Sequence, residues 1–140
     1  MSGESVIFDP AQLPWNHDGL LPVIAQQQAT GEVLMLAWMN ADALAETLET
    51  GRVCYWSRSR QRLWRKGERS GQTQYLRALY LDCDRDAVLL QVDQTGAACH
   101  TGRRSCFYQQ VVDGRIQVTT QPMIEPALLY ARNTDASTQH

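Results

Sequence analysis

The sequence contains two short clusters of side chains that could bind metal ions, and the first of them is acidic. It reads Asp82-Cys83-Asp84-Arg85-Asp86. If this stretch is extended, the three aspartates lie on one side of the backbone and Cys83 lies on the other. Three adjacent carboxylates repel one another unless a cation or protons compensate, and such oxygen ligands suit Mg²⁺ or Ca²⁺. The alternative is a solvated acidic turn, because aspartate is common in turns.

The second cluster combines thiols with a histidine. It runs from Cys99-His100 to Cys106, and Cys83 lies sixteen residues before Cys99. Three protein ligands and an open fourth position for water are typical of catalytic zinc. The alternative is that the three cysteines are small buried apolar side chains, as free cysteine often is. Their glycine, serine, arginine and aspartate neighbours argue against a core position, whereas the apolar run around Cys54 predicts a core residue there.

His100 has two roles that the sequence leaves open. Its unperturbed pKa, near ~6.5, suits a residue that moves protons at neutral pH. As a fourth zinc ligand it would instead close the coordination sphere and make the site structural. With three thiolate ligands, a zinc-bound water is less acidic than with three neutral histidines. Catalysis would therefore need a nearby base or a polarised substrate.

A third feature is a run of basic residues, here called the basic block (residues 52–69). It contains seven basic residues and one acid, so it carries +6 while the rest of the chain carries −8. Arginine makes bidentate contacts to phosphate, and Gly67 and Gly71 allow backbone N–H groups to approach a ligand closely. This pattern favours a phosphate-bearing substrate over the alternative of a solvated charged loop. The net charge of −2 argues against a general nucleic-acid binder.

Hydrophobic periodicity and turn residues predict the elements that position these clusters. Asn40 caps a helix from Ala41 to Thr50, Gly51 ends it, and a short second helix covers residues 126–132. Asp113-Gly114 is the turn of a two-residue hairpin. The predicted strands are residues 20–28, 32–39, 52–57, 72–81, 87–92, 107–112 and 115–119. The fold class is therefore α+β, a single compact domain with a mostly antiparallel sheet and one main helix.

Several motifs occur in an order that is specific to one protein family. They are Ser57 to Arg60, Leu63 to Glu68, Ser70-Gly71, the acidic cluster, and the run from Cys99 to Tyr108. Together with segments 18–22 and 31–40, they closely resemble the phosphoribosyl-AMP cyclohydrolases of histidine biosynthesis. The resemblance covers residues 18–108. Two positions depart from it, because that family usually has threonine at the position of Arg69 and often has histidine at that of Gln72.

The resemblance implies a metal-dependent hydrolase that opens the adenine ring of 1-(5-phosphoribosyl)-AMP between nitrogen 1 and carbon 6. Zinc-bound hydroxide would attack carbon 6, which the phosphoribosyl group on nitrogen 1 makes electrophilic, and His100 would transfer a proton. The basic block would hold the two substrate phosphates. The predicted substrate-binding residues are Arg58, Ser59, Trp64, Lys66, Gly67, Glu68, Ser70 and Gly71.

The resemblance also implies a homodimer with one Zn²⁺ per subunit and with Mg²⁺. Cys83 of one chain would bind zinc together with Cys99 and Cys106 of the other chain. The implied magnesium ligands are Asp82, Asp84 and Asp86. The partners would be the nucleotide substrate and a second copy of the chain, with neither nucleic acid nor a membrane involved.

Residues 1–17 are expected to form an N-terminal segment, residues 18–132 the cyclohydrolase domain and residues 133–140 a flexible tail. About thirty residues follow Tyr108, which is too few for a second catalytic domain and predicts a single-function enzyme. No apolar run approaches the ~20 residues of a transmembrane helix, and the N-terminus does not read as a signal peptide. We therefore expect the protein in the cytoplasm.

Two other functions are weighed against this one. A zinc nucleobase deaminase would need His-x-Glu and Pro-Cys-x-x-Cys motifs, and neither is present. A zinc-stabilised binding module could use the basic block to hold phosphate-containing partners. The coordination of zinc distinguishes the module from the enzyme, because only the enzyme needs an open position for water.

Overall fold

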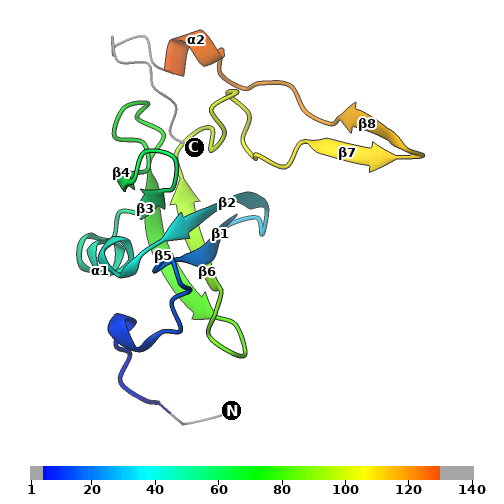
Figure 1. Ribbon diagram of the computed structural model, residues 1–140. Coiled ribbons are helices and arrows are strands. Elements are labelled where there is room, and N and C mark those ends of the chain that lie inside the picture. Colours follow the sequence, from blue (N-terminus) through cyan, green and yellow to red (C-terminus); the bar gives the residue numbers. More distant parts are fainter. Residues whose placement is uncertain (1–4, 130–140) are drawn as a thin grey trace.

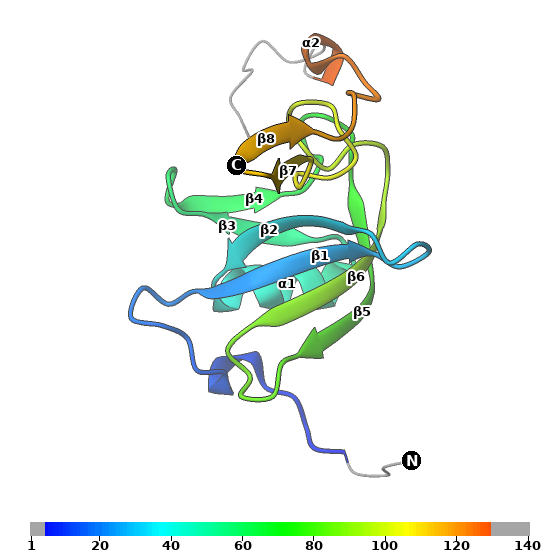
Figure 2. The same ribbon diagram turned by 90° about the vertical axis from the view of Figure 1, so that its right-hand side faces the viewer.

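The computed structural model of the chain describes residues 5–129, and its centre is a four-stranded sheet (Figures 1 and 2). The strands, in the order β2-β1-β6-β5, are β2 (Val33–Met39), β1 (Leu21–Gln27), β6 (Val88–Gln94) and β5 (Gln74–Leu81). The pairs β1–β2 and β5–β6 are antiparallel, whereas β1 and β6 run parallel. The predicted α+β fold is confirmed, and the parallel pair is an addition that the sequence pattern did not indicate.

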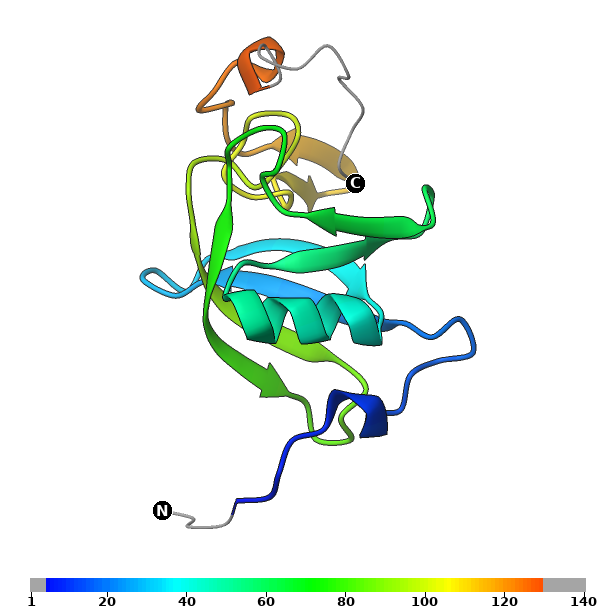
Figure 3. The ribbon, with the colours of Figure 1, turned by 90° about the vertical axis from the view of Figure 1, so that its left-hand side faces the viewer.

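The main helix, α1 (Ala41–Thr50), lies across one face of this sheet (Figure 3). Asn40 Oδ1 accepts a hydrogen bond from the Ala43 N–H at 2.8 Å, and Gly51 ends the helix with a φ of +79°. Both helix boundaries are therefore as predicted. Thr47 faces the core, and its hydroxyl accepts a hydrogen bond from the Cys54 N–H at 2.9 Å, which ties the helix to the strand that follows it.

That strand begins a two-stranded hairpin, β3 (Cys54–Ser57) and β4 (Arg62–Arg65), inside the basic block. The prediction of a loop after residue 57 is wrong for Arg62–Arg65. Tyr55 and Trp64 are paired across the two strands, with ring centroids 5.1 Å apart, and both are buried. Aromatic cross-strand pairs stabilise antiparallel pairing. The many charged residues around Trp64 favoured a loop in the prediction, so the strand was missed.

A second hairpin, β7 (Gln109–Val112) and β8 (Arg115–Val118), projects from the body of the molecule (Figure 1). Its turn residues Asp113 and Gly114 have φ angles of +50° and +74°, so this hairpin is confirmed. A 3₁₀ helix, η1 (Pro10–Gln12), precedes the sheet, and the short helix α2 (Pro126–Leu129) follows the hairpin. Residues 130–132 of the predicted second helix and the predicted tail 133–140 lie outside the described residues. Within residues 5–129, no helix has the length and apolar character needed to cross a membrane.

The core lies between the sheet, α1 and β3, and it includes Cys54. Its largest fully buried side chains include Tyr55, Leu34, Met35 and Met39. Burial raises the pKa of the Cys54 thiol to about 12, so this cysteine stays protonated. The prediction that Cys54 is a core residue rather than a metal ligand is confirmed.

Candidate active site

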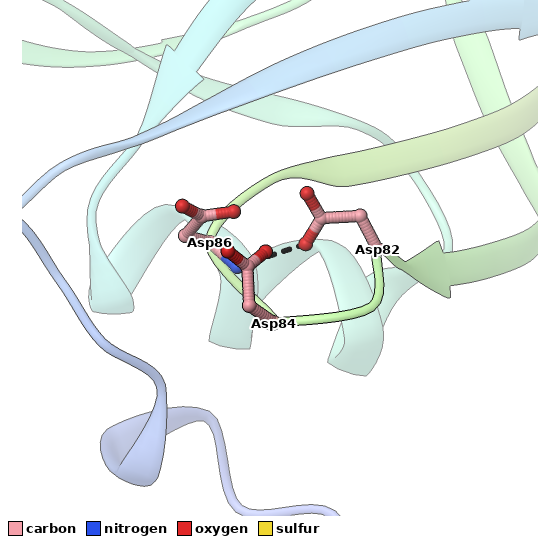
Figure 4. Close-up of side chains that lie close together, drawn as sticks. All are labelled: Asp82, Asp84 and Asp86. Carbon is pink, nitrogen blue, oxygen red and sulfur yellow. Dashed lines mark hydrogen bonds between the residues drawn. The ribbon is translucent and has the colours of Figure 1, made fainter.

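The connection between β5 and β6, here called the aspartate turn (residues 82–86), gathers three carboxylates (Figure 4). The turn is tight, because Asp82 Oδ1 accepts a hydrogen bond from the Asp86 N–H at 3.0 Å and Arg85 has a φ of +64°. The assumption of an extended backbone is therefore wrong. One oxygen each from Asp82, Asp84 and Asp86 nevertheless lies within 4.8 Å of the others. Among residues 5–129, no other group of three acidic, cysteine or histidine side chains meets in this way.

The carboxylate of Asp86 interacts with both of its acidic neighbours in this turn. Hydrogen bonds with Asp84 and Asp82 raise the pKa of Asp86 to about 6. All three side chains are exposed, so a bound cation could keep several water ligands. Mg²⁺ is usually held by one or more carboxylates with water completing an octahedron, and the aspartate turn fits this donor set.

The pKa of Asp86 predicts a pH dependence of cation binding. Folding raises this pKa from 3.8 to about 6, so between these values the folded protein takes up a proton that the unfolded chain does not. The metal-free protein therefore gains stability as the pH falls through this window. A cation bound by the Asp86 carboxylate stabilises the protein less at these pH values, because protonation removes the charged ligand. We expect Mg²⁺ to raise the melting temperature at about pH 7.5 and to have little effect at about pH 5.

Thermal unfolding with and without Mg²⁺ at both pH values measures this effect. Asp86→Asn is the control, because it removes the titrating group and should make the remaining Mg²⁺ effect nearly independent of pH. An equal Mg²⁺ shift at both pH values in the unaltered protein would contradict the assignment of Asp86 to the cation site.

The connection between β6 and β7, here called the cysteine loop (residues 95–108), brings Cys99 and Cys106 together. Their thiols are close enough for each to shift the pKa of the other. The Cys106 N–H donates to the Leu34 carbonyl at 2.7 Å, which fixes this end of the loop to β2. The structure therefore places two of the three predicted zinc ligands side by side, although they are seven residues apart in sequence.

The pair of thiols is arranged so that one of them ionises easily. The hydrogen bond with Cys106 lowers the pKa of Cys99 to about 5, and the Thr101 hydroxyl, which donates to Cys99 Sγ at 3.1 Å, contributes in the same direction. The same bond raises the pKa of Cys106, as does its burial. Near neutral pH the pair therefore carries one negative charge and one proton, and a metal ion would displace that proton.

The other two residues predicted for the zinc site lie apart from this pair or at its edge. Cys83 is exposed in the aspartate turn and forms no metal-binding group with Cys99 and Cys106 within the described part of one chain. His100 is exposed in the cysteine loop, directly after Cys99. One chain by itself thus supplies two adjacent thiols and an accessible imidazole.

A cavity of about 290 Å³, here called the tryptophan cavity, lies where β2, β3 and β4 meet. Its lining residues are Leu36, Ala37, Trp38, Trp56, Ser57, Arg58, Ser59 and Trp64. The Arg58 guanidinium lies 4.6 Å from the ring centroid of Trp38. Indole rings offer flat apolar faces to a planar base, and arginine binds phosphate, so the lining suits a nucleotide. Three predicted substrate residues, Arg58, Ser59 and Trp64, meet here.

The prediction did not include Trp38 and Trp56 in this cavity. Both were visible as strand residues, and Trp38 lies within segment 31–40, which carried part of the resemblance. Their meeting depends on β2 lying beside β3, a long-range contact that local sequence patterns do not reveal. Aromatic side chains that remain half-buried on neighbouring strands were the available signal.

The remaining predicted substrate residues follow β4 in a turn of residues 66–71. Gly67 has a φ of +84°, and a Cβ there would lie 2.6 Å from backbone atoms of Gln72 and Thr73. This glycine is therefore required by the packing of the turn itself. Gly71 has a similar φ of +78°, but nothing lies within 4 Å of the position of its Cβ.

This contrast gives a matched pair of substitutions. Gly71→Ala introduces backbone strain alone and should lower the free energy of unfolding by about 1–2 kcal/mol. Gly67→Ala adds a collision with the backbone and should lower it by about 3 kcal/mol or more. Urea unfolding of the two variants measures the difference, and equal losses would show that the turn relaxes freely around Gly67.

Arg65 and Lys66 of the basic block have hydrogen-bond partners in other elements of the protein. Arg65 makes two hydrogen bonds of 2.7 Å to the carboxylate of Glu46 on α1. Lys66 is 5% exposed, its Nζ donates to the Ala98 carbonyl at 2.6 Å, and burial lowers its pKa to about 8. Glu68 accepts a hydrogen bond from the Arg65 N–H at 3.4 Å. The charge of Arg65 is therefore paired within the protein.

Besides Arg65, four arginines of the basic block are exposed, and they are Arg52, Arg58, Arg60 and Arg62. The Arg52 guanidinium lies over the ring of Tyr75, and Arg58 lines the tryptophan cavity. Ser70, whose hydroxyl accepts a hydrogen bond from the Gln72 N–H at 3.2 Å, begins the return of the chain into β5.

A larger cavity of about 570 Å³ lies elsewhere on the molecule and contains none of the predicted site residues. It is lined mainly by the N-terminal segment and by residues 79–81.

Comparison with known proteins identifies the family. A family profile described as Phosphoribosyl-AMP cyclohydrolase matches residues 35–108. A protein of that name from Alkalilimnicola ehrlichii is 65% identical over 122 residues, covering 87% of this chain and 86% of its own. The one from Magnetococcus marinus is 60% identical over 124 residues, covering 89% and 96%. The matched region contains the tryptophan cavity, the aspartate turn and both thiols of the cysteine loop, and the chain belongs to the phosphoribosyl-AMP cyclohydrolase family.

Proposed function

We propose that the protein hydrolyses 1-(5-phosphoribosyl)-AMP in histidine biosynthesis and opens the adenine ring between nitrogen 1 and carbon 6. The observation that carries this proposal is the family match over residues 35–108, because it spans every cluster from which chemistry was predicted. The tryptophan cavity, with its indole rings and Arg58, supports a planar base that carries phosphate. The ring-opening reaction is hydrolysis of a cyclic amidine C–N bond.

We further propose one Zn²⁺ per subunit, bound in a homodimer by Cys99 and Cys106 of one chain and Cys83 of the other. The adjacent thiols of the cysteine loop support this set, because they supply two soft ligands that lose a proton readily. Cys83 is exposed and lies apart from the other two thiols, so its side chain is accessible to a metal ion held by a second chain. When bound, zinc would lower the pKa of a coordinated water and supply the hydroxide that adds at carbon 6.

Magnesium would be held by the aspartate turn, through Asp82, Asp84 and Asp86. Their exposed oxygens are hard donors, and their mutual repulsion disfavours the cation-free state. Cys83 lies in the same turn, so binding of Mg²⁺ would also fix the backbone that presents the thiol. The two metals would thus lie close to one another in the assembled site.

The bond changes require a proton transfer, and we propose that His100 performs it. A carbon–oxygen bond forms at carbon 6, the bond from carbon 6 to nitrogen 1 breaks, and nitrogen 1 takes up a proton. The exocyclic amino group stays and becomes part of a carboxamide, so no ammonia is lost. His100 is exposed beside Cys99 and carries an imidazole suited to accept a proton from water and deliver it to nitrogen 1.

The substrate would lie between the tryptophan cavity and the turn of residues 66–71. Trp64 and Arg58 would contact the base and a phosphate, and Ser59 could donate a hydrogen bond to the same phosphate. Ser70 and the backbone N–H of Gly67 would contact the second phosphate, and Glu68 would accept hydrogen bonds from the hydroxyls of its ribose. Gly71, whose N–H donates to the Gly67 carbonyl at 2.8 Å, would shape the turn rather than supply a donor. Lys66 belongs to the same predicted set, although its ammonium points to the cysteine loop.

All four cysteines are free thiols, which favours a reducing compartment. Thiolate metal ligands need such an environment, because oxidation to a disulfide would remove them. We therefore propose that the enzyme acts in the cytoplasm on a small-molecule nucleotide.

Turnover of the purified protein tests this function. Zinc-loaded protein is incubated with phosphoribosyl-AMP and Mg²⁺, and the ultraviolet absorbance is followed as the purine opens. We expect turnover that disappears with a chelator and returns with zinc. Absence of turnover, together with an X-ray absorption spectrum showing four protein ligands on zinc, would favour the zinc-stabilised binding module instead.

A further inference from the structure

Lys66 is a buried cation that the reaction described above does not use. It is the single lysine of the chain. Its side chain crosses from the end of β4 to the cysteine loop, where Nζ donates to the Ala98 carbonyl at 2.6 Å. Nζ also lies 5.6 Å from the ring centroid of Trp64, which lines the tryptophan cavity. Lys66 therefore connects that cavity to the residue directly before Cys99.

The backbone around Lys66 is held in place on both sides. The Lys66 N–H donates to the Val53 carbonyl at 3.0 Å. The next residue, Gly67, is confined by the backbone of Gln72 and Thr73. From this position the buried side chain extends to the cysteine loop, where Nζ is bonded to the Ala98 carbonyl.

Burial of this ammonium is costly with the partners that one chain provides. The Ala98 carbonyl is the one hydrogen-bond acceptor that Nζ has among residues 5–129, and water is largely excluded. A buried charge with incomplete pairing destabilises a folded protein. The ammonium is bonded to the residue directly before Cys99, on the loop that also carries Cys106, so thiolates that bind a metal there would compensate its charge.

We propose that Lys66 is a positioning residue for the thiol site: its ammonium holds the Ala98 carbonyl in place and supplies the positive charge that stabilises the Cys99 and Cys106 thiolates as metal ligands. The inference rests on the proposed function for the identity of the metal. It assigns Lys66 to the cysteine loop rather than to a substrate phosphate. Since zinc with three thiolates is a negatively charged centre, a nearby buried cation strengthens binding.

Three variants separate charge from hydrogen bonding. Lys66→Met removes both, whereas Lys66→Gln removes the charge but keeps an N–H donor that can reach toward Ala98. Gln72→Ala is the matched control, because Gln72 Oε1 accepts a hydrogen bond from the neighbouring Ala97 N–H at 3.0 Å and is uncharged. Each dimeric protein is measured for zinc affinity by chelator competition and for the melting temperature of its metal-free form.

We expect Lys66→Met and Lys66→Gln to weaken zinc binding by about tenfold or more. The melting temperature of the metal-free form of Lys66→Met should change little, because loss of the Ala98 hydrogen bond is offset by removal of a buried charge. Gln72→Ala should lower the metal-free melting temperature, since it leaves the Ala97 N–H without its acceptor and removes no charge. A loss of zinc affinity without a matching loss of metal-free stability is not expected of a purely structural residue.

Unchanged zinc affinity in Lys66→Met would overturn the proposal. The proposal would also be overturned if Lys66→Gln bound zinc normally while Lys66→Met did not. That result would show that the hydrogen bond to Ala98, and not the positive charge, supports zinc binding. An increase in KM alone, at unchanged zinc affinity, would assign Lys66 to the substrate. If Lys66→Met does not fold, Lys66→Gln carries the comparison. Absence of zinc from the unaltered protein would mean that the proposed function has failed, a result distinct from any of these.

Discussion

Cys99→Ala is expected to lose stoichiometric zinc and to lower the ring-opening rate by at least about a thousandfold. A site with three protein ligands has no spare donor, so removal of one leaves too few for tight binding. Cys99 is also the thiol whose pKa lies at about 5, so the variant loses the ligand that ionises most readily. Metal content is measured by atomic emission on the purified dimer, and turnover by absorbance.

Cys54→Ala is the matched control for this experiment. Cys54 is fully buried and is not a predicted metal ligand. Removal of its sulfur leaves a small cavity, which should lower the free energy of unfolding by about 1–2 kcal/mol. Zinc content and rate should remain those of the unaltered enzyme. If Cys99→Ala retained normal zinc and rate while Cys54→Ala lost both, the ligand assignment would be wrong.

Mixing two inactive variants is expected to restore activity. A dimer of one Cys83→Ala chain and one Cys99→Ala chain has one site with no defect, because that site takes Cys83 from the second chain and Cys99 from the first. Its other site carries both defects. Random exchange of subunits gives such mixed dimers in half of the molecules, so about one quarter of the original activity should return.

The control for this mixture combines Cys106→Ala with Cys99→Ala. Both cysteines belong to the same half of the proposed site, so every dimer carries a defect at each site and activity should remain absent. Activity in neither mixture would contradict ligands drawn from two chains. Gel filtration of each variant shows whether the dimers still form, so failure to assemble is separated from failure to complement.

Local sequence signals predicted the elements that depend on caps and turns. Asn40, Gly51 and Asp113-Gly114 placed α1 and the β7–β8 hairpin because each residue satisfies a backbone requirement where it stands. The parallel pairing of β1 with β6 was not predicted, since it joins strands separated by residues 28–87. In the basic block, charge concealed β4, whose pairing depends on the contact between Tyr55 and Trp64.

The features of the candidate site also divide into those that local sequence predicts and those that depend on tertiary packing. The aspartates are close in sequence, so their convergence follows even though the turn is tight rather than extended. The approach of Cys99 to Cys106 depends on closure of the cysteine loop onto β2, and the tryptophan cavity depends on three strands meeting. Such contacts are properties of tertiary packing. Cys83 belongs to neither group, and its predicted partners lie in a second chain.

The mass of the reaction product tests the central claim most directly. Zinc-loaded enzyme is incubated with phosphoribosyl-AMP and Mg²⁺ in ¹⁸O-labelled water, and the product is analysed by mass spectrometry. Hydrolytic ring opening predicts a product that gains one whole water, carries the label in its new carboxamide and retains every nitrogen. A product that has exchanged an amino group for oxygen, with ammonia released, would identify a deaminase and contradict the proposed reaction.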